Sequence, residues 1–184
     1  MDASRNSLVM PLLGLLVEQP AHAYDLTARL QSRYTHLRVT RSTVTTLLKS
    51  MERAGTVAPR APAQVEGRPP RTAYELTGAG VADLSRRVEA GLRDARPASI
   101  DFVLAVSYAG LLAACQVAAI LQTRLDRLVE EAVRYERADG IPEVYMLETD
   151  YWRAVLTAEM EWIRRLTARI RSHDILWPSE GNAS

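Results

Sequence analysis

Cationic and hydroxyl side chains share residues 40–54 with aliphatic ones. Val44, Leu47, Leu48 and Met51 recur at helical spacing, so the segment is predicted to be a helix with one buried face, capped by Thr40 or Ser42 and ended by Gly55. Its other face could contact DNA, because Arg and Lys donate to guanine edges and small hydroxyls reach bases or phosphates in a major groove. The candidate residues on that face are Arg41, Ser42, Thr43, Thr45, Thr46 and Lys49.

A simpler alternative is that the threonines only tolerate exposure to solvent. A run of β-branched residues is a poor choice for a purely structural surface helix, which favours the binding interpretation.

A proline-rich and arginine-rich loop follows this helix. Residues 56–60 and 72–76 are predicted to pair as two strands, and the loop 61–71 between them has too little apolar material to pack. Its cations Arg68 and Arg71 suit a phosphate backbone or a minor groove. Helix, strand, loop and strand in this order predict a winged helix with a two-stranded wing.

The net charge of +1 conceals an asymmetry along the chain. Residues 1–96 contain 14 Lys/Arg and 9 Asp/Glu, whereas residues 97–184 contain 9 and 13. A basic segment beside an acidic one indicates a surface for a polyanion, although a solvated basic face would give the same count.

The remaining elements of the first half would support the winged helix. Apolar residues at helical spacing predict helices over 4–18 and 21–34, the second with Tyr24, Leu26, Leu30 and Tyr34 as apolar bulk. A further helix, capped by Thr77, is predicted over 78–93. Residues 1–95 are therefore predicted to form a DNA-binding domain.

Several classes of function are disfavoured by the composition. The sequence contains no phosphate-binding glycine loop and no nucleophile elbow, so we do not expect an enzyme. A single Cys115 and three scattered His residues predict neither a disulfide nor a metal site, and we expect no cofactor. We recognise no membrane span and no export signal, which indicates a cytoplasmic protein.

Three segments resemble the PadR-like transcriptional regulators: MPLLGLLVEQPAHAYDLTARL, RSTVTTLLKSMERAGTV and GRPPRTAYELTGAGVADL. The resemblance covers residues 7–92 and is most specific at Tyr74, Leu76, Thr77 and Gly80. It implies a cytosolic homodimeric winged-helix repressor of a palindromic operator. It also implies that Ser42, Thr43, Thr45, Thr46 and Lys49 lie on the reading helix, and Arg68 and Arg71 on the wing.

The sequence departs from the family pattern at two places. Ala23 stands where the family commonly has the glycine of a His-Gly-Tyr triplet, and Thr45 and Thr46 stand where it commonly has a tyrosine and often a proline. The second departure concerns the base contacts and the target sequence rather than the fold.

The second half is predicted to contain helices over 98–109, 111–139 and 143–172, followed by a disordered tail, 178–184. Along the middle helix, Arg124 and Arg127 are expected on the solvent side of an apolar seam. The last helix carries two apolar stripes, and a second copy of the chain would cover one of them. Residues 96–177 are thus predicted to form a helical dimerisation and effector domain.

Three aromatic residues of the second half, Tyr108, Trp152 and Trp162, are candidate contacts for a small aromatic effector. The alternative for each is a plain core aromatic residue. The function predicted is a ligand-responsive DNA-binding repressor; the alternative is a winged-helix module that binds other proteins without reading DNA.

Overall fold

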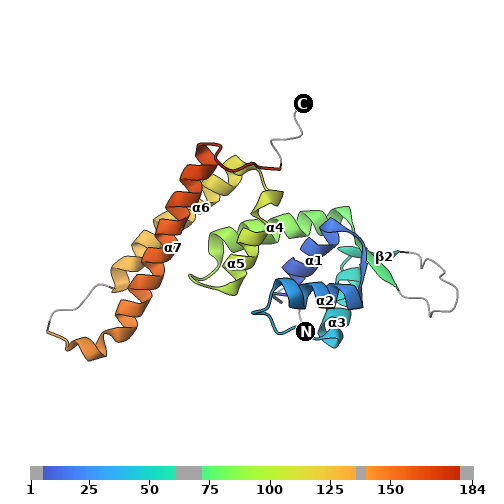
Figure 1. Cartoon of the computed structure of the whole chain (residues 1–184), viewed down its shortest axis with the longest axis horizontal. Helices are drawn as coiled ribbons and strands as arrows, with labels where there is room; N and C mark the ends of the chain where they lie inside the picture. The colour runs from blue at the N-terminus through green and yellow to red at the C-terminus, as the bar shows by residue number, and fades with distance from the viewer. Residues whose placement is uncertain (1–5, 61–71, 136–139, 179–184) are drawn as a thin grey trace. The chain divides into compact units, whose positions relative to one another are not determined.

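The computed structural model describes residues 6–60, 72–135 and 140–178 (Figure 1). The chain divides into two compact units, residues 1–87 and 88–184. Both are mainly helical, and the only sheet among the described residues is small and antiparallel, which confirms the predicted fold class. None of the described helices is long and apolar enough to cross a bilayer.

The N-terminal unit contains three helices, α1 (Val9–Glu18), α2 (Ala23–Arg33) and α3 (Arg41–Arg53), and the first half of α4 (Gly78–Asp94). Its core is aliphatic, with Leu12, Leu26, Leu30 and Leu48 fully buried. Helix α1 begins later than predicted, because Pro11 has no amide hydrogen and fits best in a first turn. Residues 4 and 5 of the predicted helix lie outside the described residues.

Three short strands form the sheet: β1 (Ala21–His22), β2 (Val57–Arg60) and β3 (Ala73–Leu76). Strand β3 lies in the middle and pairs with β2 as the predicted hairpin, with Val57 opposite Leu76. The start of a helix is predicted at β1, but this segment instead pairs Ala21 with Tyr74. Two residues are too few to show a strand period, so no pattern in the sequence indicates this strand.

The join between β3 and α4 explains the most specific part of the family-like pattern. The Thr77 hydroxyl accepts from the Gly80 amide at 3.0 Å and donates to the Gly55 carbonyl at 2.7 Å. A Cβ atom at Gly80 would overlap the Thr56 carbonyl oxygen and lie 2.7 Å from Leu76 Cδ1. Residue 80 must therefore be glycine for α4 to start against the end of α3 and the start of β2.

The C-terminal unit contains α5 (Ile100–Ser107), α6 (Ala114–Ala132) and α7 (Leu147–Arg171), with short 3₁₀ turns η2 (Ala109–Leu111), η3 (Val133–Tyr135) and η4 (Glu143–Tyr145). Helices α6 and α7 pack side by side and antiparallel (Figure 1). Leu121 and Leu128 of α6 and Leu156 and Ile163 of α7 are buried, as the predicted seam requires.

One prediction for α6 is wrong. The helical pattern predicts Arg124 on the solvent side, but this residue is 0% exposed, whereas Arg127 is exposed as predicted. The physical reason is that the guanidinium donates to Glu159 on α7 and to the Ala95 carbonyl just after the end of α4.

Candidate nucleic-acid interface

Helix α3 begins with a cluster of hydroxyl groups. The Thr40 side chain caps the helix by accepting from the Thr43 amide at 3.2 Å. The Thr40 hydroxyl also lies 3.0 Å from the Ser42 hydroxyl and 2.8 Å from that of Thr43. Because free amides and the positive end of the helix dipole also lie here, this end of α3 favours an anion such as a phosphate.

The two faces of α3 are divided as the sequence predicts. Val44, Leu47, Leu48 and Met51 are buried, with at most 3% exposure. Of the six predicted DNA-contacting residues of the helix, Thr43 and Thr45 are half-buried, and the other four are exposed: Arg41, Ser42, Thr46 and Lys49.

The half-buried threonines use their hydroxyls inside the helix. Thr43 contacts the cap, and Thr45 donates to the Arg41 carbonyl at 2.9 Å. Among the described residues, Thr46 makes no side-chain hydrogen bond. Ser42, Thr46 and Lys49 are spaced four and three apart, so they form one outward stripe along the helix. We call Ser42, Thr46 and Lys49 the α3 stripe.

Tyr24, at the start of α2, lies on the surface although the helical pattern predicts it as part of the core. It is 56% exposed, and the Arg41 guanidinium carbon lies 5.9 Å from the centroid of its ring. A signal for this exposure exists in the sequence, because Tyr24 is out of step with the buried Leu26 and Leu30. A cation over an aromatic face is held by the ring quadrupole, so Tyr24 restrains Arg41 beside the α3 stripe.

Arg29 and Arg33 of α2 have a structural role. Both form ion pairs with Glu18 at the end of α1. The hydrogen bond from Arg33, together with the charges of the two arginines, lowers the pKa of the Glu18 carboxyl from its ordinary value of 4.5. These ion pairs hold α1 against α2, and α2 in turn packs against α3.

The predicted wing is described only at its base. Strands β2 and β3 pair up to Arg60 opposite Ala73. Arg68 and Arg71 lie within residues 61–71, outside the described part of the chain.

The predicted effector residues lie at separate places in the C-terminal unit. Trp152 stacks on Tyr135 with ring centroids 6.2 Å apart, and Trp162 meets Phe102 edge-on at 6.0 Å. The two tryptophans are ten positions apart on α7, or about 15 Å along the axis. Tyr108 is half-buried at the end of α5. The structure therefore does not gather Trp152 and Trp162 around one small ligand.

Among the described residues, no group of three His, Cys, Asp or Glu side chains could hold a metal ion. Cys115 is exposed.

Comparison with known proteins finds one family model that matches the N-terminal part of the chain. Residues 12–86 match the model of the "Transcriptional regulator PadR-like family". No curated protein matches the chain.

Several solved structures are similar. Bacillus subtilis PadR in complex with operator DNA is 16% identical, with 90% of this chain and 99% of that chain covered and a TM-score of 0.43. A PadR-like transcription factor from Bacteroides fragilis is 28% identical over 43% of this chain and 74% of that chain, with a TM-score of 0.39. A PadR-like regulator from Bacillus cereus is 16% identical over 88% and 94%, with a TM-score of 0.39.

Proposed function

We propose that this chain is a cytoplasmic, sequence-specific DNA-binding repressor of the PadR-like kind, which acts as a homodimer on a palindromic operator. The proposal starts from the match of residues 12–86 to the model of the PadR-like family of transcriptional regulators. The family is one of regulators, which agrees with the expectation that the chain is not an enzyme.

The observation that carries the proposal is the outward face of α3. The α3 stripe presents two small hydroxyl side chains and one cation at helical spacing, with the exposed Arg41 at the same end of the helix as Ser42. Lys49 and Arg41 supply charge for phosphates or guanine edges, and Ser42 and Thr46 are short enough to let the helix enter a major groove. In this proposal Arg68 and Arg71 contact the phosphate backbone from the wing.

The surface of α7 supports the proposed homodimer. Its buried stripe packs on α6, but the other predicted stripe stays open, with Leu147 60% and Tyr151 63% exposed. Val155, Ala158 and Trp162 continue it as half-buried or exposed positions. A contiguous apolar stripe of this kind marks an interaction surface, and a second copy of the same helix would bury it.

Dimerisation gives the proposed function its affinity. Two reading helices held about one turn of DNA apart, near 34 Å, contact both half-sites of an inverted repeat. Binding the first half-site raises the effective concentration of the second reading helix at its own half-site.

A small aromatic effector remains part of the proposal. Trp162 and Tyr108 are both half-buried, and Trp152 stacks on Tyr135, so a ligand that binds near either tryptophan would change its fluorescence. Titration with a panel of aromatic acids tests this part; a constant emission spectrum across the panel would argue against an effector at these residues.

The test of the whole proposal is selection of bound sequences from random duplex DNA with the purified full chain. We expect an inverted repeat whose half-sites are about one helical turn apart. If no motif is enriched, the protein-interaction alternative is favoured. Salt dependence is a second criterion, because a dimer that contacts roughly 6–10 phosphates loses about 10³–10⁵ in affinity between 50 and 200 mM salt.

A further inference from the structure

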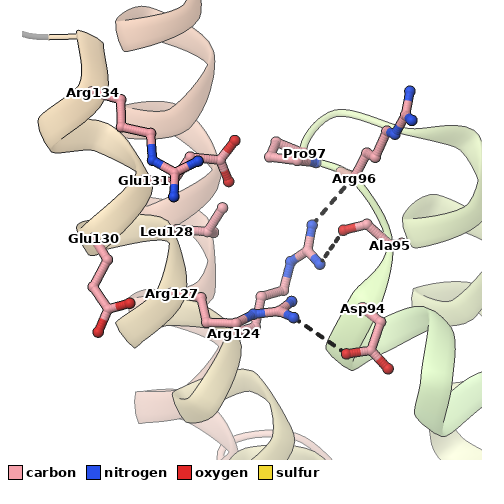
Figure 2. Close-up of a pocket in the computed structure, with 10 residues that line it drawn as sticks. All are labelled: Asp94, Ala95, Arg96, Pro97, Arg124, Arg127, Leu128, Glu130, Glu131 and Arg134. Carbon is pink, nitrogen blue, oxygen red and sulfur yellow. Dashed lines mark hydrogen bonds and ion pairs between the residues drawn. The ribbon is translucent and has the colours of Figure 1, made fainter.

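A buried arginine, Arg124, links three segments of the C-terminal unit, and Figure 2 shows its contacts with the residues that follow α4. The Arg124 side chain on α6 is 1% exposed. Its Nε and Nη2 atoms donate to Oε1 of Glu159 on α7 at 2.8 and 2.6 Å. Its Nη1 donates to the Ala95 carbonyl at 2.7 Å, just after the end of α4. Glu159 is nearly as enclosed, at 9%.

The contacts around this pair are also specific. The Arg124 guanidinium carbon lies 4.0 Å from the centroid of the Phe102 ring on α5, so the cation is stacked as well as hydrogen-bonded. The second oxygen of Glu159 accepts from the Ala98 amide at 2.8 Å. Ala98 has a φ of 52°, a left-handed conformation that is unfavourable for alanine and that the Glu159 contact helps to hold.

A second arginine of α6 binds the same end of α4. Arg127 contacts the Asp94 carboxylate at 3.2 Å (Figure 2), and it also donates to the Arg93 carbonyl. The last carbonyls of a helix have no partner within it and carry the negative end of the dipole, so cations stabilise them. We call Arg124, Glu159 and Arg127 the α4 clamp.

A buried ion pair is an inefficient way to gain stability, since apolar residues of the same volume stabilise a core as well or better. The pair does fix the relative orientation of the segments that it joins. The planar guanidinium offers donors in a fixed fork, and in Arg124 this group is used in three directions at once, toward α7, α5 and the end of α4.

Helix α4 is continuous from Gly78 to Asp94, with its first half in the N-terminal unit and its last two turns in the C-terminal unit. The contacts of Arg124 and Arg127 hold the end of α4 and the residues that follow it on α6, within the C-terminal unit.

We propose that Arg124 and Glu159 are positioning residues: they set the direction of α4 relative to the α6–α7 pair and thereby the half-site spacing that the dimer accepts. This rests on the proposed DNA-binding function. Neither residue contacts DNA; each acts through α4.

The first test measures the direction of α4 without DNA. Spin labels are attached at two exposed positions, through Ala82→Cys and Arg164→Cys in a Cys115→Ser background, and labelled chains are diluted with unlabelled ones so that distances are intramolecular. We expect one narrow distance distribution. The double variant Arg124→Met/Glu159→Leu leaves no buried unpaired charge, and should at least double the width while circular dichroism shows it folded.

The second test measures half-site spacing. Binding is compared on the selected operator, on operators with one or two base pairs inserted between the half-sites, and on a single half-site. We expect the double variant to lose tenfold or more of the spacing preference while half-site affinity stays within about twofold. Arg169→Ala is the matched control, since Arg169 of α7 forms an exposed ion pair with Asp174; it should behave as wild type.

The outcomes separate the clamp from the proposed function. The proposal is overturned if the distance distribution of the folded double variant is as narrow as that of wild type. It is also overturned if the distance distribution of wild type is broad. So does a broadened distribution with unchanged spacing preference. A narrow wild-type distribution that the double variant broadens, in a protein that ignores all DNA, supports the α4 clamp while the regulator assignment itself fails.

Discussion

The glycines at the start of α4 allow a sharp test of how the winged helix is assembled. Gly80→Ala adds one methyl group where the nearest atoms are the Thr56 carbonyl oxygen and Leu76 Cδ1. The first is backbone in the join between α3 and β2 and cannot rotate away. Gly78→Ala adds the same methyl group two residues earlier, where nothing lies within 4 Å.

The two substitutions should change the free energy of unfolding in opposite directions. Overpacking costs about 1–3 kcal/mol, and any shift of α4 also weakens the Thr77 cap, worth about 1 kcal/mol. Gly80→Ala should therefore destabilise by about 2–4 kcal/mol, or roughly 4–16 °C in melting temperature at about 2–4 °C per kcal/mol. Gly78→Ala should be neutral or stabilise by about 0.4–1 kcal/mol, because it restricts the unfolded chain without strain.

Differential scanning calorimetry of the full chain measures both variants, and resolves separate transitions if the two units melt independently. Because the clash lies in the N-terminal unit, its transition should move. A Gly80→Ala variant that melts at or above the wild-type temperature would refute the reasoning, because α4 could not then lie as close to Thr56 as the clash requires.

The other predictions concern the interface, the α1–α2 ion pairs and the dimer. Thr46→Ala should change the preference for one base of the selected sequence by about tenfold. Lys49→Ala should instead weaken binding to all sequences and reduce the dependence of affinity on salt concentration. Competition gel shifts distinguish the two effects. Glu18→Gln should lower stability by about 0.2–1 kcal/mol at pH 7, since the pair is partly exposed. Because the folded pKa of Glu18 is below 4.5, its contribution is present above that pH and lost as pH falls through the folded value, so urea titrations of variant and wild type should converge in acid. Tyr151→Glu should shift the sedimentation equilibrium from dimer to monomer at micromolar concentration; an unchanged dimer would exclude the open face of α7 as the interface.

The periodicity of apolar residues is sufficient to predict the elements that have one buried face. Helix α3 has thirteen residues, long enough for the helical spacing to be unambiguous, and its buried residues are the predicted ones, Val44, Leu47, Leu48 and Met51. The same argument separates the two stripes of α7. Short or irregular elements carry no such signal: β1 has two residues, and its role depends on pairing with Tyr74, more than fifty residues away.

Arg124 shows the limit of pattern reasoning for polar residues. In the sequence it is one of several charged positions of α6, spaced like Arg127 at the edge of the same apolar seam. Its burial depends on Glu159, thirty-five positions later, and on the carbonyls that follow α4, and a helical pattern contains neither. Arginine also buries well when its donors are satisfied, so charge alone does not place it in solvent.

The same limit applies to the number of basic residues in the N-terminal half, because a count does not show which of them are free to bind DNA. Arg29 and Arg33 belong to the arginines that suggest a polyanion surface, yet both are paired with Glu18. The charge asymmetry therefore overstates the binding surface, whereas Arg41 and Lys49 are exposed on α3 and lie beside the small hydroxyls of Ser42 and Thr46. The case for DNA binding rests on this local arrangement and on the match of residues 12–86 to the PadR-like family model, not on the excess of positive charge. Replacing Arg33 should consequently lower stability more than it lowers DNA affinity. Replacing Lys49 should lower DNA affinity more than it lowers stability.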